Sequence, residues 1–77
     1  MGKTKTVKLK DFRKVIIYLG LEYKRTKGSH EAWFKKGMTR PITIQTNKKE
    51  IPIHIFKTNL KTIGITKEKF FEILKSL

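Results

Sequence analysis

The fold of this 77-residue chain depends on the segment Thr26-Lys27-Gly28-Ser29-His30. Gly and Ser are typical of tight turns, because Gly adopts positive φ angles and Ser hydrogen-bonds to its own backbone. Residues 21–36 around this segment alternate and are rich in aromatic side chains, as strands are. We therefore predict a β-hairpin whose turn at residues 27–29 places a histidine at the start of the second strand.

The residues before the hairpin predict an amphipathic helix that ends at residue 19. Apolar side chains recur there at steps of three and four residues, with Lys and Arg between them. Gly20 follows, at a position where a left-handed residue often ends a helix. We interpret residues 1–6 as a frayed terminus. The apolar positions of the helix are Leu9, Phe12, Val15, Ile16 and Leu19.

Three further elements follow the hairpin. Residues 42–45 alternate and are β-branched, which indicates a third short strand. After a polar connector, residues 46–50, Pro52 suits the first turn of a helix that runs to about residue 63. Thr66 is the expected N-cap of a terminal helix. The side chains expected to face inward are Ile53, Phe56, Leu60 and Ile63 in one helix and Phe70, Phe71, Leu74 and Leu77 in the other.

The element order α-β-β-β-α-α predicts an α+β fold. We expect a two-layer sandwich in which a three-stranded antiparallel sheet has helices on one face and an open second face. The bare architecture resembles the double-stranded RNA-binding domain. Residues 1–77 are expected to form a single domain that buries only about 60% of its unfolded surface. Such a small core leaves little room for an enclosed cofactor pocket.

The charge of the chain points to a polyanionic partner. The sequence has nineteen Lys and Arg residues and six Asp and Glu residues, which gives a net charge of +13. The basic residues are spread along the whole sequence. Repulsion at this density opposes folding, so it is usually retained for attraction to phosphate or to an acidic protein. The alternative is a solubilising surface whose lysines have no specific role.

Several classes of protein are excluded or disfavoured by composition. The chain has no cysteine and two histidines, so we expect neither disulfides nor a metal site. No apolar run approaches the roughly 20 residues that span a bilayer, and no signal peptide is recognisable. We predict a cytoplasmic protein without cofactor, metal or membrane association.

The hairpin histidine is the candidate for chemistry. Histidine is the one side chain whose unperturbed pKa lets it give and take protons near neutral pH. Cations stand on both sides of His30, and across a hairpin they are expected to flank one groove that binds RNA. The alternative is that this histidine only caps the strand. The predicted RNA-binding cations are Lys24, Arg25 and Lys27 before the turn and Lys35 and Lys36 beyond the strand.

Other residues have two interpretations each. Gly28 and Ser29 form the turn, and Ser29 also suits a phosphate contact. The alternation of the second strand sets Trp33 apart from its neighbours, so we expect it to be exposed and to contact a partner rather than to lie in the core. Lys48 and Lys49 either extend the phosphate track or form a solvated surface. For His54 a structural role is favoured.

Nearly the whole chain resembles the HicA toxin family of bacterial toxin–antitoxin systems. One departure is clear: many members carry a Pro-x-His segment after the third strand, where this chain has Gln45-Thr46-Asn47, so any contribution of that histidine is missing. The resemblance rests on Leu19-Gly20, Lys24-Arg25-Thr26-Lys27-Gly28-Ser29-His30, Ile42-Thr43-Ile44, Lys49-Glu50-Ile51-Pro52, Leu60 and Ile63-Gly64-Ile65.

The resemblance implies a small endoribonuclease that cuts mRNA without the ribosome and is held inactive by a HicB antitoxin. It implies that His30 is the catalytic residue. We expect it to activate the ribose 2′-hydroxyl or protonate the leaving 5′-oxygen, with no metal ion. Two alternatives are a non-catalytic RNA-binding module and a protein-interaction subunit whose positive surface docks an acidic partner.

Overall fold

The secondary structure follows the predicted order, with two additional short strands. A computed structural model describes residues 6–77. Residues 1–5 of the predicted frayed terminus lie outside this range, and Thr6 begins a strand that was not predicted. The elements are β1 (Thr6–Lys8), α1 (Leu9–Tyr18), β2 (Glu22–Lys27), β3 (His30–Phe34), β4 (Ile42–Gln45), β5 (Glu50–Pro52), α2 (Ile53–Ile63) and α3 (Lys67–Ser76).

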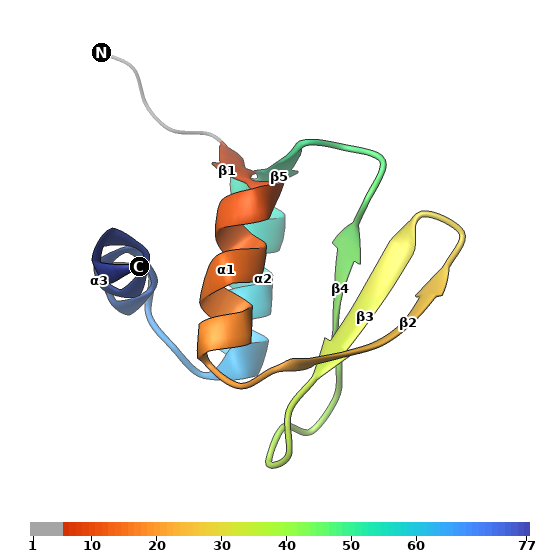
Figure 1. Cartoon of the computed structure of the whole chain (residues 1–77), viewed down its shortest axis with the longest axis horizontal. Coiled ribbons are helices and arrows are strands. Elements are labelled where there is room, and N and C mark those ends of the chain that lie inside the picture. The colour runs from red at the N-terminus through yellow and green to blue at the C-terminus, as the bar shows by residue number, and fades with distance from the viewer. Residues whose placement is uncertain (1–5) are drawn as a thin grey trace.

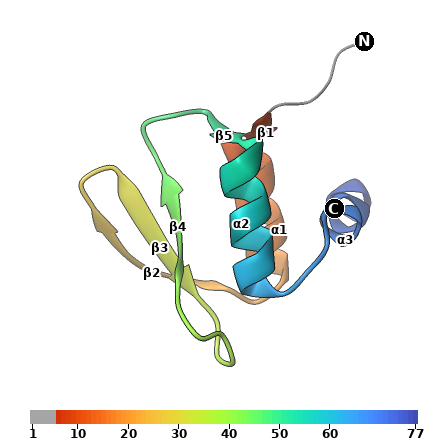
Figure 2. The ribbon, with the colours of Figure 1, turned by 180° about the vertical axis from the view of Figure 1, so that it is seen from behind.

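The main sheet has the predicted form. Its strands are antiparallel in the order β2-β3-β4, and α1 and α2 lie along one of its faces (Figure 1). The same arrangement is seen from behind in Figure 2. In both views α3 lies on the far side of these two helices from the sheet. The predicted α+β sandwich with one open sheet face is therefore confirmed, and the terminal helix covers the helix layer.

Three phenylalanines form the centre of the core. Phe12 of α1, Phe56 of α2 and Phe70 of α3 are fully buried. Their ring centroids are 6.1, 5.8 and 4.8 Å apart for the pairs Phe12–Phe56, Phe12–Phe70 and Phe56–Phe70. Each comes from a position where the helical period predicted an inward-facing side chain. The core thus joins the three helices through one aromatic cluster.

The inward face of α3 differs from the prediction. Phe70 is buried and Leu74 packs against the core as expected, but Ile73 takes the remaining inward position. Phe71 is 40% exposed and Leu77 is 56% exposed. α3 contacts α1, and its apolar stripe is wider than the side that packs there, so Phe71 and Leu77 stay partly exposed.

A second, two-stranded sheet was missed. β1 pairs antiparallel with β5, so that Val7 lies opposite Ile51, and both side chains are buried. Pro52 ends β5 and immediately precedes α2, rather than lying within its first turn. This small sheet ties the beginnings of α1 and α2 together. It therefore holds the connector between β4 and β5, residues 46–49, close to the start of α1.

Candidate nucleic-acid interface

The hairpin turn is fixed to the end of the third strand. Lys27 pairs with His30, which leaves Gly28 and Ser29 as a two-residue turn, with Gly28 at a φ angle of 61°. The carbonyl oxygen of Ser29 accepts hydrogen bonds from the backbone N–H and the side-chain hydroxyl of Thr46, at 2.7 and 3.1 Å. The position of the histidine is thus set both by the turn and by the strand beside it.

An irregularity in β2 sets Tyr23 and Arg25 on opposite faces of the sheet. Tyr23 pairs with Trp33, but the next pair is Arg25 with Ala32, so Lys24 is an extra residue between them. Such a bulge shifts the alternation by one position. Arg25 therefore shares a face with Ala32 and Lys27 instead of with Tyr23, although simple alternation along the strand would place Tyr23 and Arg25 together.

Three side chains form a row across the open face of the sheet. His30 lies between Lys27 of β2 and Gln45 of β4 in the hydrogen-bonded register. We call these three residues the His30 row, and all of them are exposed. Directly opposite residues in antiparallel strands have Cβ atoms about 5 Å apart. The exposed side chain of His30 therefore emerges from the sheet between those of Lys27 and Gln45.

A small hollow lies next to the His30 row. It measures about 140 Å³ and is open on one side. That volume holds a phosphate group or a few waters, since a water occupies about 30 Å³ in the liquid. The buried Asn59 of α2 lies at this hollow and donates a hydrogen bond from Nδ2 to the carbonyl of Thr43, at 3.3 Å. It is lined by His30, Thr43, Ile44, Gln45, Glu50, Ile51, Pro52, Ile55 and Asn59.

The comparison with protein families agrees with this geometry. The family model described as HicA toxin of bacterial toxin–antitoxin systems matches residues 9–65. The chain belongs to the HicA toxin family. The matched region includes the whole His30 row and everything from α1 through α2. No curated protein and no solved structure matches the chain.

Residues 6–77 of this HicA-family chain lack both a membrane-spanning helix and a cluster of metal ligands. Within residues 6–77 no helix is long and apolar enough to cross a membrane. The same residues contain no group of three or more His, Cys, Asp or Glu side chains placed to hold a metal ion.

The predicted cations of this HicA-family chain do not share one groove. Lys24, Lys35 and Lys36 line a separate hollow of about 320 Å³ at the other end of the hairpin. The five residues of β3 place that end about 13 Å from His30. Lys48 and Lys49 lie on the connector instead. Of the predicted cations on the hairpin, the register places Arg25 and Lys27 on the same face as His30, and the expected single groove is wrong.

Lys35 has a structural partner. Its ammonium group donates a hydrogen bond to the carbonyl oxygen of Leu19, at 3.0 Å. That carbonyl belongs to the C-terminal end of α1, where the helix dipole favours a cation. The predicted role of Lys35 in RNA binding did not include this bond, because the position of the helix end beside the strand depends on tertiary structure.

Lys35→Met is therefore expected to lower the free energy of unfolding by at most about 1 kcal/mol, since it removes a cation from a helix C-terminus. Urea denaturation followed by circular dichroism measures this effect. Lys36→Met is the matched control, because it removes the same charge and keeps the bond to Leu19. Equal destabilisation by the two changes would show that the bond contributes nothing.

Trp33 lies in the core, which corrects the predicted exposure. The side chain is 8% exposed, and its indole N–H donates to Glu31 Oε1 at 2.8 Å. Arg13 of α1 holds the same carboxylate through Nε and Nη2, both at 3.1 Å. Trp33 shares its face with Ile42 in the register, and this is the face that α1 and α2 cover. A contact between Trp33 and a partner is therefore not available in this fold.

Tyr23 takes the exposed position that was expected for Trp33. It is 51% exposed, stacks edge-on against Trp33 at 6.0 Å and shares a 2.7 Å hydrogen bond with Thr26. Because β2 is the outer strand of the sheet, its residues on the helix side extend beyond the helices. Tyr23 is thus an aromatic side chain available to solvent at the edge of the sheet.

Three residues of the site were missed by sequence reasoning. Gln45 and Thr43 alternate with the buried Ile42 and Ile44, so the strand pattern already placed them on the open face. What it did not give was the register, which sets Gln45 opposite His30. Asn59 lies three residues after Phe56 and four before Ile63, so the helical period places it on the apolar face, but its polar side chain kept it out of the predicted core.

Gly28 is expected to tolerate asparagine and not valine. Its φ angle of 61° lies in the left-handed region, which costs a residue with a β-branched side chain about 1–2 kcal/mol, whereas asparagine adopts it readily. A Cβ atom there would meet nothing within 4 Å, so the cost is one of backbone strain. We expect Gly28→Val to lower the urea midpoint clearly and Gly28→Asn to leave it nearly unchanged. Equal midpoints would contradict the strained turn.

Proposed function

We propose that this HicA-family toxin is an mRNA endoribonuclease with residues 1–77 as a single domain and His30 as general acid and base. The observation that carries the proposal is the His30 row, in which an exposed histidine is flanked by Lys27 and Gln45 on the neighbouring strands. Cleavage of RNA needs a proton acceptor for the 2′-hydroxyl and a proton donor for the departing 5′-oxygen. Imidazole serves in both roles near neutral pH.

Each member of the row has a proposed task. The imidazole takes the 2′-hydroxyl proton as the 2′-oxygen attacks phosphorus, the P–O5′ bond breaks, and the 5′-oxygen takes up a proton. Lys27 stabilises the charge on the non-bridging phosphate oxygens, and the Gln45 amide donates a hydrogen bond to the same group. Arg25, Gly28 and Ser29 contact the neighbouring phosphates. This chemistry proceeds without a metal ion.

The expected rate is modest. Acid–base catalysis by a positioned side chain contributes about 10² to 10⁴-fold. The other histidine of the chain lies on α2, and the segment after β4 carries Asn47 where many family members have a histidine. One imidazole supplies most of the acid–base chemistry. The absence of a second histidine after β4 also favours the second candidate function, an RNA-binding module without catalysis.

A HicB antitoxin is the proposed inhibitor. The family is defined by toxin–antitoxin pairs, and a net charge of +13 favours rapid, electrostatically steered association with an acidic protein. We propose that the antitoxin covers the His30 row and that its release exposes the row. Since the proposed substrate is mRNA, we place the protein in the cytoplasm.

The direct test is the chemistry of the cleaved ends. Purified protein is incubated with a long single-stranded RNA in EDTA, and the termini of the fragments are identified. We expect cleavage with 2′,3′-cyclic phosphate and 5′-hydroxyl ends. Fragments with 5′-phosphate and 3′-hydroxyl ends, or cleavage that stops in EDTA, would contradict attack by the 2′-hydroxyl. Binding of RNA without any cleavage would establish the binding module instead.

A further inference from the structure

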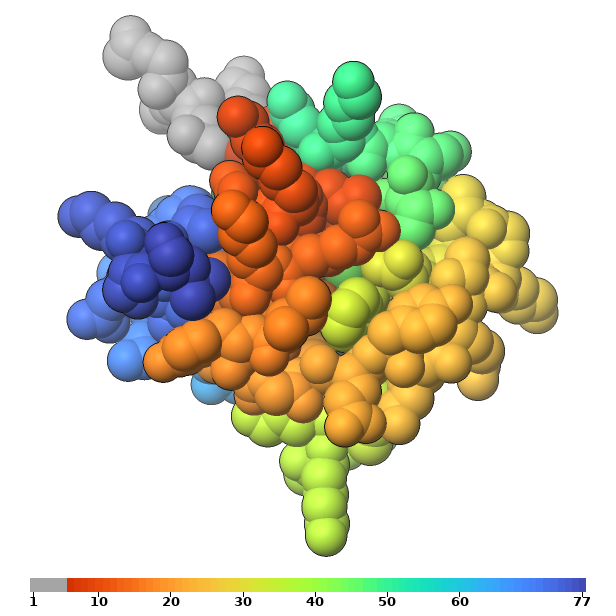
Figure 3. All heavy atoms as spheres, viewed as in Figure 1, coloured from red at the N-terminus to blue at the C-terminus, as the bar shows by residue number. Residues whose placement is uncertain are grey.

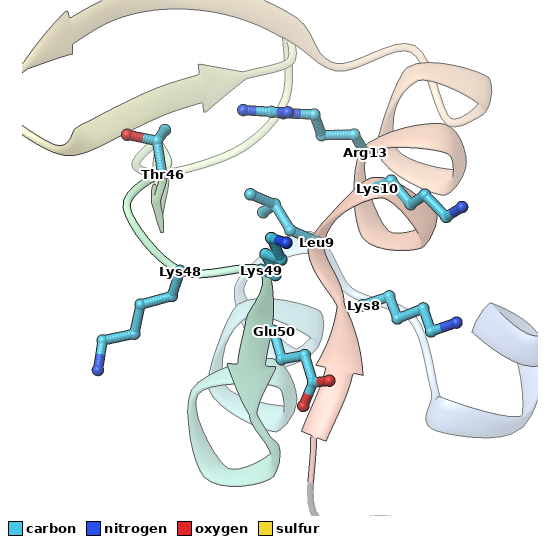
Figure 4. A pocket seen from close by; sticks show the side chains of 8 residues that line it. All are labelled: Lys8, Leu9, Lys10, Arg13, Thr46, Lys48, Lys49 and Glu50. Atoms are coloured by element: carbon cyan, nitrogen blue, oxygen red, sulfur yellow. The ribbon is translucent and has the colours of Figure 1, made fainter.

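A basic hollow lies between the start of α1 and the connector. It measures about 420 Å³ (Figure 4). We call it the connector hollow. Lys48 extends on one side of it, Lys8 and Lys10 on the other, and Lys49 lies between them. Five cationic residues and one carboxylate line it. The lining residues are Lys8, Leu9, Lys10, Arg13, Thr46, Lys48, Lys49 and Glu50.

The one carboxylate does not neutralise the connector hollow. Glu50 accepts a hydrogen bond from the hydroxyl of Thr6 on the neighbouring strand β1. Figure 4 shows its side chain directed along the small sheet rather than toward Arg13 or Lys48. Arg13 is held by Glu31, so its guanidinium is fixed in place. The lysines therefore give the hollow an excess of positive charge that is available to an anion.

The N-terminal end of α1 adds positive electrostatic potential to the connector hollow. Lys8 occupies the N-cap position and, within residues 6–77, its side chain makes no capping hydrogen bond. The backbone N–H of Leu9 donates to the carbonyl of Lys49 at 2.9 Å, which holds the connector against the helix. The first N–H groups of a helix carry partial positive charge and bind anions. Here that end of the helix lies at the connector hollow, among its lysines.

The connector hollow is close to the His30 row in the chain and in space. Thr46 lines the hollow and is hydrogen-bonded to Ser29 in the hairpin turn. Gln45, the residue before it, is the partner of His30. Lys48 is the third residue after Gln45, so their Cα atoms are at most about 11 Å apart. Figure 3 shows the hairpin, the connector and the start of α1 side by side on one face of the molecule.

We propose that the connector hollow is a second phosphate-binding site, which holds the sugar-phosphate backbone of RNA a few nucleotides from the bond at His30. The inference rests on the proposed function, since it takes RNA as the ligand. A strand that lies on the His30 row and crosses the connector enters the hollow. Lysine acts as a point charge without base readout, so binding there is independent of sequence. RNA that is too short to reach the hollow binds weakly.

The test compares two variants with the same loss of charge. The hollow variant carries Lys10→Gln, Lys48→Gln and Lys49→Gln, and the control carries Lys61→Gln, Lys67→Gln and Lys75→Gln on α2 and α3. All six lysines are exposed. Both sets are placed in a His30→Ala background, so that the RNA stays intact. Fluorescence anisotropy gives the affinity for a labelled 12-nucleotide RNA and a labelled trinucleotide.

We expect the hollow variant to bind the longer RNA at least about tenfold more weakly. Its slope of log affinity against log salt should fall by about 2, since each lost phosphate contact on single-stranded RNA contributes about 0.7. The control variant should lose less than about threefold, and trinucleotide binding should be the same in all three proteins. Equal losses in the two variants, or an equal loss for the trinucleotide, would overturn the proposal.

Two further outcomes distinguish RNA binding in the hollow from binding of an acidic protein, and this proposal from the proposed catalysis. Poly-L-glutamate of similar length is the probe for an acidic protein ligand. If the hollow variant loses its binding to poly-L-glutamate as strongly as its binding to RNA, the hollow is a general acidic-ligand site and the proposal is wrong. If the parent protein fails to cleave RNA while the hollow variant selectively loses the longer RNA, the phosphate site stands and the proposed catalysis falls.

Discussion

His30→Ala is expected to lower RNA cleavage by about 10² to 10⁴-fold and to leave RNA affinity within about threefold of the parent. The large effect follows from loss of the general acid and base, and the small effect follows because most of the affinity comes from cations and phosphate. Both quantities are measured on the same long RNA, with cleavage followed in EDTA and binding followed by anisotropy. Circular dichroism confirms that the variant is folded.

His54→Ala is the matched control for this change. His54 is the second histidine of the chain and is exposed in the first turn of α2, so its removal alters the composition in the same way. We expect its cleavage rate to equal that of the parent. Free imidazole should restore part of the activity of His30→Ala by occupying the vacated space beside Lys27 and Gln45. Undiminished cleavage by His30→Ala, or an equal loss in both variants, would remove His30 from the mechanism.

Phe56→Ala is expected to cost about 3–5 kcal/mol of stability. Its ring is fully buried and touches Phe12 and Phe70, so truncation leaves a cavity between three helices that a small domain closes poorly. A chain of this size has a total stability of roughly 4–12 kcal/mol. We therefore expect the variant to lose a large share of its stability and to unfold at a much lower urea concentration than the parent. Trp33 is the only tryptophan, so its fluorescence reports urea unfolding directly.

Phe71→Ala is the control for the loss of a ring. Phe71 packs against Phe56 at a centroid distance of 5.9 Å, but it is 40% exposed. Its truncation should cost about 1 kcal/mol, because solvent already reaches the ring. Similar unfolding midpoints for Phe56→Ala and Phe71→Ala would show that the aromatic cluster is not the centre of stability.

Much of the fold was predictable because its causes are local. Apolar residues at helical spacing predicted α1 with its buried Phe12 and α2 with its buried Phe56. The side chain of Thr66 caps α3 through the backbone N–H of Lys69, at 3.0 Å. Gly28 gave the hairpin turn, and with it the position of His30. In each case the signal lies within a few residues of the feature it predicts.

The features that were missed depend on contacts between distant parts of the chain. β1 and β5 are three residues each, too short to show a period, and they pair Thr6 with Pro52. The alternation of β3 gave Trp33 the correct parity, but the choice of buried face depends on where α1 lies. Lys35 looked like a free cation until the end of α1 was placed beside it.

The sequence by itself determined the order of the elements, the hairpin turn, the strongly basic surface and the membership of the HicA toxin family. Only the tertiary structure decided which side chains stand together: Gln45 beside His30, Lys35 on the end of α1, and the lysines of the connector around one hollow. The physical reason is the sequence separation over which the interactions act. Helical periods, caps and turns are set by interactions over about four residues, whereas a binding surface is made by strand register and packing between segments far apart in the chain.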